Sequence, residues 1–545
     1  MLTKIDGLCF KELIGGGIES LLVNKARLND LNVFPVPDGD TGTNMLMTAR
    51  YGFEAIKDKE LTLGEMAGTF ASSAVFGARG NSGVILSQFF KGIASALDGA
   101  CEADAQLLHK SLAAGCEYAY KSVAKPVEGT MLTVLRDAAA AAESILPTAG
   151  VDALIGEYLA AARVSLDNTP NLLPILKEAG VVDSGACGIV CFFEGIEKRI
   201  KGEEIGESEE VVEIDGTLDL TKFNKNTSFE YGYCVEGLVQ LKVDEEAFSV
   251  SDFKSGLEKI GSSIVATLEG DKLKLHVHTK KLGRVMDYCQ KLGEFLTVKV
   301  ENMSVQHIQR QAEDQGDKLL YSRDGGASEF KVVAVATSTL AQKMLFDMGA
   351  DVVILSDIAP SSQEFMDAFA LADSKNIIVF PNSPNSVMTS VQAGKLYDSA
   401  RVTVLNSRSL AECYAALSVM DFDADADSVI ADANTAISGA YHISIYHADK
   451  DIMYGDKFIE RNEFFALAGK QIIEIDDSLE ETAVDAARRV CRERECAVIT
   501  LFYGVGIAEK FVEKLKKKIE SRISDVEVVT VSTEEALYSL MIMFE

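Results

Sequence analysis

The stretch NVFPVPDGDTGTNM, residues 32–45, decides how the N-terminal part of the chain folds. Pro35 and Pro37 fix φ and favour an extended backbone, so this stretch is predicted to be a loop. On both sides of it, apolar residues recur at intervals of three and four, as on one face of an amphipathic helix. Clear examples are residues 61–77, 83–97 and 133–146. Residues 1–200 are therefore predicted to form an all-α domain whose loops carry the unusual chemistry.

The loop presents two carboxylates, Asp38 and Asp40, separated by a single glycine. Two carboxylates on a stiff loop suit Mg²⁺, which prefers oxygen ligands and shares its other positions with water and nucleotide phosphates. We predict that both aspartates bind Mg²⁺ and are catalytic. Asn32 or Asp30 would supply a third oxygen ligand.

Two other structures could explain the aspartate pair. The first is a solvated turn that caps the next helix, since Thr41, Thr43 and Asn44 are good caps for a helix beginning near Met45. The second, an EF-hand, is excluded. Its sixth and twelfth positions, counted from Asp38, hold Thr and Ala where the motif requires Gly and Glu.

A second motif, FGARGNSGVILSQ at residues 76–88, places glycines and Ser82 just before a predicted helix. Backbone N–H groups at a helix start bind anions, and glycine lets a phosphate come close. The pattern is not a Walker A loop, because GxxxxGK[ST] does not occur in the chain. Tight helix packing would also explain these glycines. An acidic loop and a glycine-rich helix start in one domain together indicate a bound nucleotide.

Two further loops place small residues at helix starts, KPVEGTMLTVLRD at residues 125–137 and VVDSGACGIV at residues 181–190. Asp183 in the second loop could add a carboxylate to the site. In this order, the four motifs resemble the DhaL-type nucleotide-binding domain of the dihydroxyacetone kinase superfamily. They are more closely similar to the catalytic component of the bacterial fatty acid kinase family, and the likeness continues, more weakly, to the C-terminus.

This resemblance implies a barrel of amphipathic helices that binds ATP and two Mg²⁺ ions at one end. Asp38 and Asp40 would bind the metal ions with help from Asn32, and Thr130 and Met131 would border the adenine. The residues expected to bind the nucleotide are Asn44, Gly80, Asn81, Ser82, Gly83, Thr130, Met131 and Asp183.

The resemblance also implies a reaction, in which ATP phosphorylates the carboxylate of a fatty acid to give acyl phosphate and ADP. A separate DegV-like fatty-acid-binding protein would present this substrate. A carboxylate with a pKa near that of Glu, ~4.3, is already ionised at neutral pH, so no general base is required. The only histidine of this domain, His109, lies in a helical run and is predicted to have a surface or packing role.

The rest of the chain is predicted to hold a linker and two more domains. Residues 201–226 are acidic and poor in aromatic residues, which favours a linker. Residues 227–315 contain short alternating strands and one helical stretch, which indicates a small α+β domain. Residues 328–545 alternate apolar strands with helices, which predicts a parallel α/β domain.

The middle domain contains a candidate metal site. His276 and His278 are two apart on a predicted strand, so their side chains should share one face. Cys234 and His307 could complete a tetrahedral set for Zn²⁺, which prefers imidazole and thiolate ligands. The alternative is one buried, hydrogen-bonded histidine and one exposed histidine. The middle domain of the fatty acid kinase family looks similar at these motifs, which implies a bound metal.

By the same resemblance, the C-terminal domain is DegV-like and serves homodimerisation or docking of the binding partner. It departs from the family pattern at three places, Thr337–Thr339, residues 356–362 and residues 531–545. These departures concern the choice of partner more than phosphoryl transfer.

Composition excludes several classes of function. The formal net charge of −30 argues against sequence-independent binding of nucleic acid, which depends on Lys and Arg. No apolar run approaches the ~20 residues needed to span a bilayer. The N-terminus lacks a signal-peptide core, so we expect a cytoplasmic protein. Cys187 and Cys191 are spaced i, i+4 and are predicted to be reduced thiols on one helix face.

Two alternative functions stay open. The first is one component of a dihydroxyacetone-type kinase, whose known relatives bind the ketone covalently through a His on a separate chain or domain. The second is a nucleotide-binding scaffold or regulator without turnover, which the diverged C-terminal loops favour. The intact motifs at Asp38, Asp40 and Gly80–Gly83 oppose the scaffold.

Overall fold

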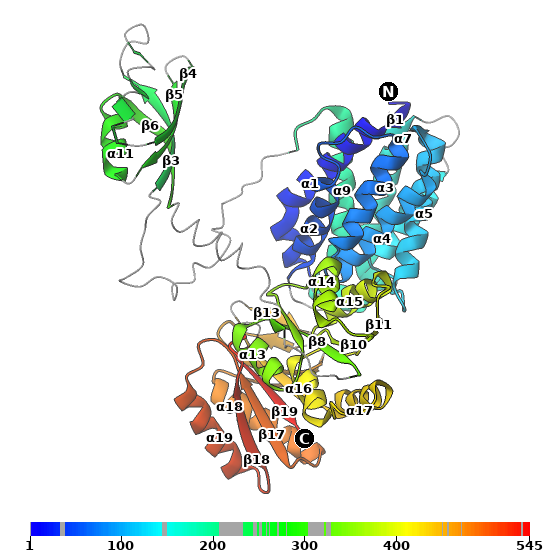
Figure 1. Ribbon diagram of the computed structural model, residues 1–545, viewed down its shortest axis with the longest axis vertical. Helices are drawn as coiled ribbons and strands as arrows, with labels where there is room; N and C mark the ends of the chain where they lie inside the picture. Colours follow the sequence, from blue (N-terminus) through cyan, green and yellow to red (C-terminus); the bar gives the residue numbers. More distant parts are fainter. Residues whose placement is uncertain are drawn as a thin grey trace. The chain divides into compact units, whose positions relative to one another are not determined.

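The chain divides into two compact units, one formed by residues 1–211 and 320–545 and the other by residues 212–319 (Figure 1). The computed structural model describes residues 2–32, 39–143, 150–205, 233–242, 248–249, 253–254, 256–257, 259–260, 262–269, 272–279, 281–302, 321–322, 329–448, 451–454, 457–469, 471–535 and 538–545.

The N-terminal part of the first unit is a bundle of α-helices, drawn in blue and cyan in Figure 1. The helices are α1 (Gly7–Asp30), α2 (Thr41–Glu54), α3 (Leu63–Phe76), α4 (Gly80–Ala96), α5 (Ala105–Ser122), α6 (Met131–Ala142), α7 (Val151–Leu172), α8 (Pro174–Ala179) and α9 (Ser184–Lys201). Two short strands, β1 (Lys4–Asp6) and β2 (Glu102–Asp104), pair antiparallel. The prediction of a helical N-terminal domain is confirmed, with this strand pair as an addition.

The bundle encloses one hydrophobic core, to which the apolar faces of the long helices contribute. Its largest fully buried side chains include Leu21, Leu28, Met45, Phe70, Phe89, Tyr158 and Phe192. The backbones of α1 and α9 touch, because a Cβ on Gly195 would lie 2.1 Å from the carbonyl oxygen of Gly16. Cys187 and Cys191 are buried on α9 and free, as predicted.

The second unit is a small α+β domain, as predicted. Its four strands are β3 (Tyr233–Leu241), β4 (Ser262–Glu269), β5 (Lys272–Thr279) and β6 (Gly293–Asn302). They form an antiparallel sheet with the order β4-β5-β3-β6. Helix α11 (Leu282–Gln290) covers the sheet, and its Val285 and Cys289 join a core with Val235 and Val277.

The C-terminal part of the first unit begins with a sheet of the order β11-β10-β8-β9-β7, in which the edge strand β7 is antiparallel and the other pairs are parallel. The strands are β7 (Tyr321–Ser322), β8 (Lys331–Ala336), β9 (Val352–Leu355), β10 (Asn376–Phe380) and β11 (Arg401–Val404). The helices are α13 (Thr339–Asp347), α14 (Ser362–Ala372), α15 (Pro384–Leu396), α16 (Leu410–Val419) and α17 (Ala426–Gly439).

Helices cover both faces of this sheet. Along β8, Val332 and Ala334 join the core beneath α13, α16 and α17, whereas Val333 and Val335 join the core beneath α14 and α15. Successive side chains of a strand point to opposite faces, so a strand buried on both sides reads as a continuous apolar run. This sheet positions α14 and α15 on the side that contacts the helical bundle.

The second C-terminal sheet differs from the predicted parallel arrangement. Its order is β16-β15-β12-β19-β17-β18, and β17 with β18 is the parallel pair, whereas the other pairs are antiparallel. The strands are β12 (Tyr441–His447), β15 (Phe464–Ala468), β16 (Gln471–Asp476), β17 (Val498–Tyr503), β18 (Glu527–Ser532) and β19 (Leu540–Phe544), with a separate hairpin of β13 (Ile452–Tyr454) and β14 (Lys457–Ile459). Strands β15 and β16 are joined through Gly469, with φ +59°, and so short a connection permits only antiparallel pairing.

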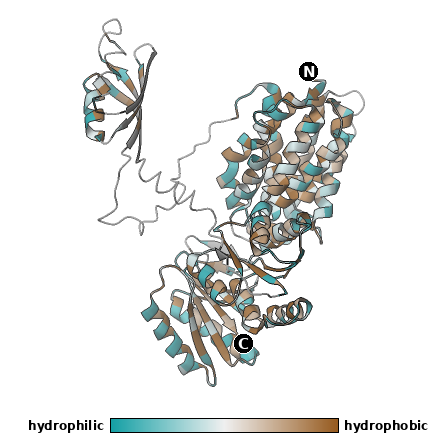
Figure 2. Ribbon diagram, viewed as in Figure 1, coloured by the Kyte–Doolittle hydropathy of each residue, from teal (hydrophilic) through white to brown (hydrophobic). Residues whose placement is uncertain are grey.

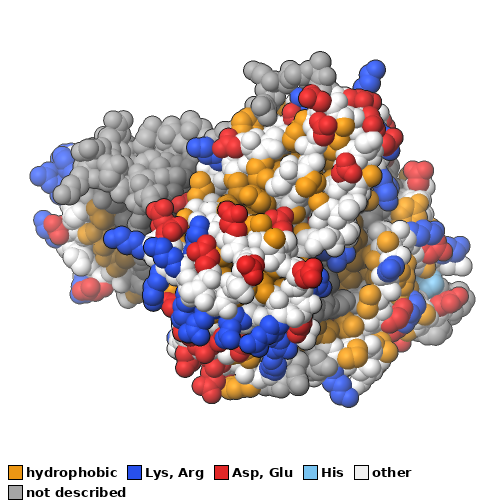
Figure 3. Space-filling view, turned by 90° about the horizontal axis from the view of Figure 1, so that it is seen from below, with side chains coloured by type: hydrophobic (Ala, Val, Ile, Leu, Met, Phe, Trp, Pro, Cys, Tyr) orange, Lys and Arg blue, Asp and Glu red, His pale blue; other side chains and the backbone are white. Residues whose placement is uncertain are grey.

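Apolar and polar residues are divided unevenly among the elements of the C-terminal part. In Figure 2 the strands of the C-terminal part are hydrophobic, whereas α19 (Glu509–Arg522) is largely hydrophilic and buries only Val512, Leu515 and Ile519 on the sheet. Figure 3 shows Lys and Arg side chains gathered in a band on one face. Helix α18 (Leu479–Glu493) packs beside α19. Among the described helices, none combines the length and apolar character needed to cross a membrane.

Candidate functional site

The acidic loop leads into α2 differently from the prediction. Helix α2 begins at Thr41, not near Met45, and Asp40 occupies its N-cap position. Asp38 lies outside the described residues, so its predicted role stays a prediction. Asn32, two residues after the end of α1, is buried, and its backbone N–H donates to the carbonyl oxygen of Asn29 at 3.1 Å.

Asp40 stands at the cap position but does not cap the helix with its side chain. Asn29, at the end of α1, makes the bond instead: its Oδ1 accepts from Thr43 N at 3.1 Å, and its Nδ2 donates to Thr43 Oγ1 at 3.0 Å. The Thr43 N–H in the first turn of α2 is thus satisfied without the carboxylate of Asp40. This arrangement weakens the interpretation of the Asp-Gly-Asp turn as a mere helix cap.

Asn44 lies one turn after Asp40 and is almost completely buried, with an exposed fraction of 1%. Its side-chain oxygen Oδ1 has no hydrogen-bond partner among the described residues. A buried amide oxygen without a partner is costly, so such an atom commonly faces a ligand, an ion or water. An oxygen acceptor one helical turn from a carboxylate fits a hydrated Mg²⁺ or a donor group of a nucleotide.

The glycine-rich motif forms the first turn of α4 and directly contacts Asn44. Gly80 has φ +57°, and a Cβ on it would lie 2.4 Å from Asn44 Nδ2, so only glycine fits. The residue at the N-cap, Arg79, makes no side-chain capping bond. Thr48 ties the two helix starts together, because its Oγ1 donates to Asn44 O at 2.7 Å and accepts from Arg79 N at 3.2 Å. A Cβ on Gly83 would lie 2.3 Å from that same Oγ1.

The remaining predicted nucleotide residues lie at the starts of α6 and α9. Thr130 is at the N-cap of α6, and its Oγ1 donates to Val127 O at 2.8 Å. Asp183 is buried at the N-cap of α9 and accepts from Ala186 N at 2.8 Å and from the backbone N–H of Met131. Burial raises the pKa of Asp183 to about 6, although both backbone bonds oppose this rise. Its carboxylate therefore organises two helix starts.

These helix starts are connected to one another. Three glycines contact side chains of a neighbouring helix so closely that an added Cβ would lie 2.4–3.2 Å from them. These contacts are Gly80 with Asn44 (α4 and α2), Gly188 with Met45 (α9 and α2) and Gly185 with Met131 (α9 and α6). The N-termini of α2, α4, α6 and α9 thus gather at one end of the bundle, and Asn81 and Ser82 lie in the first turn of α4 there. Helix N-termini carry partial positive charge, so this end attracts an anion in spite of the negative net charge.

The C-terminal part of the same unit adds a residue that the sequence did not reveal. Asn385, the second residue of α15, donates from Nδ2 to Asp40 Oδ2 at 3.2 Å and Oδ1 at 3.4 Å. Its Oδ1 accepts from Asn81 Nδ2 at 2.9 Å. The motif Ser383-Pro384 marks a helix start, but no local signal in the sequence places it against residues more than 300 positions away.

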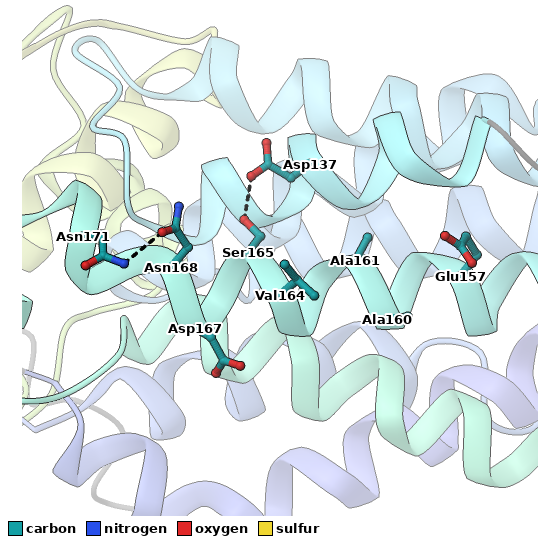
Figure 4. A pocket seen from close by; sticks show the side chains of 9 residues that line it. All are labelled: Asp137, Glu157, Ala160, Ala161, Val164, Ser165, Asp167, Asn168 and Asn171. Atoms are coloured by element: carbon teal, nitrogen blue, oxygen red, sulfur yellow. Dashed lines mark hydrogen bonds between the residues drawn. The ribbon is translucent and has the colours of Figure 1, made fainter.

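A shallow hollow of about 690 Å³ lies elsewhere on the bundle, along α7 (Figure 4). Asp137, Glu157 and Asp167 are among its lining residues, and Ser165 Oγ donates to Asp137 Oδ2 at 2.7 Å. Three carboxylates repel a triphosphate, and none of the predicted site residues lines this hollow. We do not assign the nucleotide to it.

The remaining sequence predictions concern His109 and the candidate zinc ligands of the middle domain. His109 Nε2 lies 2.9 Å from Ala139 O between α5 and α6, which confirms its packing role. The backbone register pairs Cys234 with His278. The side chains of Cys234, His276 and His278, and the whole of His307, lie outside the described residues. Among the described residues, no cluster of three or more His, Cys, Asp or Glu could hold a metal ion.

Comparison with protein families gives matches along nearly the whole chain. A DAK2 domain matches residues 35–198. The middle domain of the FakA-like fatty acid kinase proteins matches residues 230–310, and their C-terminal domain matches residues 331–545.

Individual relatives span the full length. A protein of Staphylococcus epidermidis is 34% identical over 538 residues, which cover 97% of each chain. A protein of Staphylococcus haemolyticus is 33% identical over 557 residues, which cover both chains completely. Among solved structures, the dihydroxyacetone kinase from C. freundii, in complex with AMP-PNP and Mg²⁺, is similar over 36% of this chain and 35% of its own, with 20% identity and a TM-score of 0.29.

Proposed function

Because the chain belongs to the FakA-like fatty acid kinase family, with a DAK2 domain followed by the middle and C-terminal domains of that family, we propose that it is an ATP-dependent kinase for fatty acids. A separate DegV-like binding protein presents the fatty acid. One carboxylate oxygen of the lipid bonds to the γ-phosphorus of ATP while the bond from that phosphorus to the β-phosphate oxygen breaks. Acyl phosphate and ADP are the products, and no proton has to move.

The observation that carries this proposal is the spared carboxylate of Asp40. Asn29 accepts the hydrogen bond from Thr43 N in the first turn of α2, so the carboxylate of Asp40 is not used as a helix cap. One turn further on, the buried Oδ1 of Asn44 has no hydrogen-bond partner in the described part of the chain. Acidic and amide oxygens in this arrangement suit Mg²⁺, and Asp38, Asp40 and Asn32 are the proposed ligands of two ions. When bound, Mg²⁺ neutralises the charge that builds up on the transferred phosphoryl group.

The chain itself supplies orientation and an anion site. The first turn of α4, from Gly80 to Gly83, offers backbone N–H groups to the phosphates, and the starts of α2, α6 and α9 add their dipoles. Thr130 and Met131, at the start of α6, border the adenine in this proposal. Phosphoryl transfer depends on such positioning and on charge stabilisation more than on covalent participation of the protein.

The substitution Asp40→Asn tests the proposal, because it removes the charge and keeps the shape. Turnover should fall by about 10²–10³, the usual cost of losing one electrostatic stabiliser. Asp104→Asn is the matched control, since Asp104 does cap its helix, with Oδ1 accepting from Leu107 N at 2.9 Å. ADP release would be measured with Mg²⁺, ATP and a lipid-loaded DegV-like protein. Normal turnover in Asp40→Asn would refute the assignment.

A parallel assay with dihydroxyacetone separates the acceptor classes. ADP release with dihydroxyacetone but not with the lipid-loaded protein would indicate a component of a dihydroxyacetone-type kinase. ATP binding without turnover under either condition would indicate a nucleotide-binding scaffold. Acyl phosphate formed only with the lipid-loaded protein would support the proposal.

For the middle domain we propose a bound Zn²⁺, held by Cys234, His276, His278 and His307. The direct pairing of Cys234 with His278 in the sheet register supports it. The zinc content of His278→Ala would decide, and an unchanged stoichiometry would end this idea. A cytoplasmic homodimer is the proposed assembly, and the mass of the purified chain in solution tests the dimer.

A further inference from the structure

Asn385 belongs to the C-terminal part of the chain, yet its side chain ends inside the candidate site. It lies in the first turn of α15, behind Ser383 and Pro384, and only 6% of it is exposed. Its two amide atoms have different partners: Nδ2 donates to both carboxylate oxygens of Asp40, and Oδ1 accepts from Asn81 Nδ2. A carboxylate only accepts hydrogen bonds, so Asp40 fixes which side of the amide faces it.

Other residues of this interface bond to the segment of the bundle that directly precedes Asn81. Arg79, directly before Gly80, forms a buried ion pair with Glu364 of α14 at 3.0 Å and donates to Ala359 O at 3.1 Å. The backbone N–H of Ser362 donates to Ala78 O at 3.3 Å. Burial lowers the pKa of Arg79, and its charge is balanced within the interface. Hydrogen bonds and the ion pair thus join Ala78 and Arg79 to residues 359–364, and Asn81 is joined to α15.

A second amide in this interface does not reach the site. Gln392, two turns further along α15, donates from Nε2 to Val75 O at 2.9 Å and to Ser362 Oγ at 3.1 Å. Its Oε1 accepts from Gln88 Nε2 at 3.0 Å. Gln392 therefore contributes to docking as Asn385 does, but has no bond to Asp40 or Asn81.

We propose that Asn385 is a positioning residue for the metal-binding carboxylate, so that the C-terminal part of the chain completes the nucleotide site. The hydrogen bonds from Nδ2 to both carboxylate oxygens fix the direction of the Asp40 carboxylate. A carboxylate has about four acceptor positions, so both oxygens keep lone pairs for Mg²⁺. The bond to Asn81 places the first turn of α4 at the same time. This inference rests on the proposed function.

The test is a titration of Mg²⁺ in the presence of a non-hydrolysable ATP analogue, with binding as the readout and the full chain as the protein. Removing a group that orients a metal ligand lowers metal affinity by about 10–100-fold. In Asn385→Ala the Mg²⁺ concentration for half-maximal binding of the analogue should therefore rise by about 10-fold or more. Gln392→Ala, which breaks interface bonds of the same kind, should leave that concentration unchanged.

Two further variants keep the result decisive. Asn385→Leu has the same number of side-chain heavy atoms, the same branching at Cγ and no donor, so it should show the same rise even if the Ala variant is unstable. In an Asp40→Asn background, Asn385→Ala should add only the smaller loss that comes from its bond to Asn81, since the carboxylate on which it acts has been changed. Thermal unfolding of each variant confirms that the compared proteins are folded.

Three results would overturn the inference. The first is no change in Asn385→Leu. The second is an equal rise in Gln392→Ala, which would mean that only docking matters. The third is a lower Mg²⁺ requirement, which would mean that Asn385 competes with the metal for Asp40. In each case the wild-type chain still binds the analogue with Mg²⁺ and the proposed function stands, whereas a wild-type chain that binds none refutes both.

Discussion

Asn29 and Thr43 exchange two hydrogen bonds across the base of the acidic loop, with Thr43 N donating to Asn29 Oδ1 at 3.1 Å and Asn29 Nδ2 donating to Thr43 Oγ1 at 3.0 Å. Thr43 is the third residue of α2, the position that an N-cap side chain normally serves. The end of α1 thereby caps the start of α2. The helix forms, and the residue at its N-cap, Asp40, keeps its carboxylate for another partner.

Loss of this exchange should affect both stability and the metal site. Asn29→Ala should lower the free energy of unfolding by about 1 kcal/mol, the usual cost of losing a helix cap. It should also raise the Mg²⁺ concentration needed for nucleotide binding, because Asp40 can then turn to cap α2. Urea unfolding and the Mg²⁺ titration measure the two effects. Asn24→Ala is the control on the same helix, since Asn24 Nδ2 donates only within α1, to Ser20 O at 2.9 Å.

The requirement for glycine at position 80, at the start of α4, can be tested by comparison with Gly68, where an added Cβ meets no atom within 4 Å. Gly80→Ala should cost about 2 kcal/mol, because φ is +57° and the new Cβ meets Asn44 Nδ2. Nucleotide binding should weaken in this variant as Asn44 is displaced. Gly68→Ala, in α3, meets no atom within 4 Å and should stabilise the chain by about 0.5–1 kcal/mol. Equal effects of the two substitutions would contradict the close contact between Gly80 and Asn44.

Features that depend on residues close together in the sequence could be predicted, whereas features that depend on contacts between distant segments could not. Helix periodicity and the glycine-rich starts predicted the helical domain, and apolar strands such as β8 that alternate with helices predicted the parallel sheet. The boundary of α2 was missed, because Asn29 caps it from another helix. The antiparallel half of the last domain was missed because short strands with few turn signals look alike in either direction.

The residues that join the helical bundle to the C-terminal part could not be predicted from the sequence, for another reason. In the sequence, Arg79 is a charged residue before a glycine-rich helix start, and Glu364 stands three residues after Ser361, with which it forms a capping box in the structure. Only the tertiary structure brings Glu364 to Arg79 and Asn385 to Asp40. Polar side chains that bond across domains carry no periodic or local pattern.

The ion pair between Arg79 and Glu364 should be important for the docking of the two parts. Its side chains are only 14% and 2% exposed, so Glu364→Gln leaves a buried positive charge without its counter-ion. The free energy of unfolding should fall by about 3 kcal/mol. Glu117→Gln is the control, because Glu117 and Lys121 form an exposed pair worth less than about 0.5 kcal/mol. A loss no larger than that of the control would show that Arg79 is hydrated in solution.

The buried carboxylate of Asp183 predicts a dependence of stability on pH. Its pKa rises from the ordinary value of 3.8 to about 6 in the folded chain, mainly through burial. The folded state therefore holds this proton more tightly than the unfolded state does. The stabilisation from this group is complete below pH 3.8 and is lost as the pH rises through about 6, by about 3 kcal/mol in all. Above that window the ionised form costs stability.

Asp183→Asn isolates this effect, because the amide keeps the N-cap geometry and does not titrate. The variant should gain stability relative to the wild-type chain as the pH increases from 4 to 6.5, by about 2–3 kcal/mol over that range. Urea unfolding of both proteins at each pH gives the difference, in which the other carboxylates cancel. A stability difference that stays constant across this pH range would mean that the carboxylate of Asp183 is solvated. It would then not join the starts of α6 and α9 through buried hydrogen bonds.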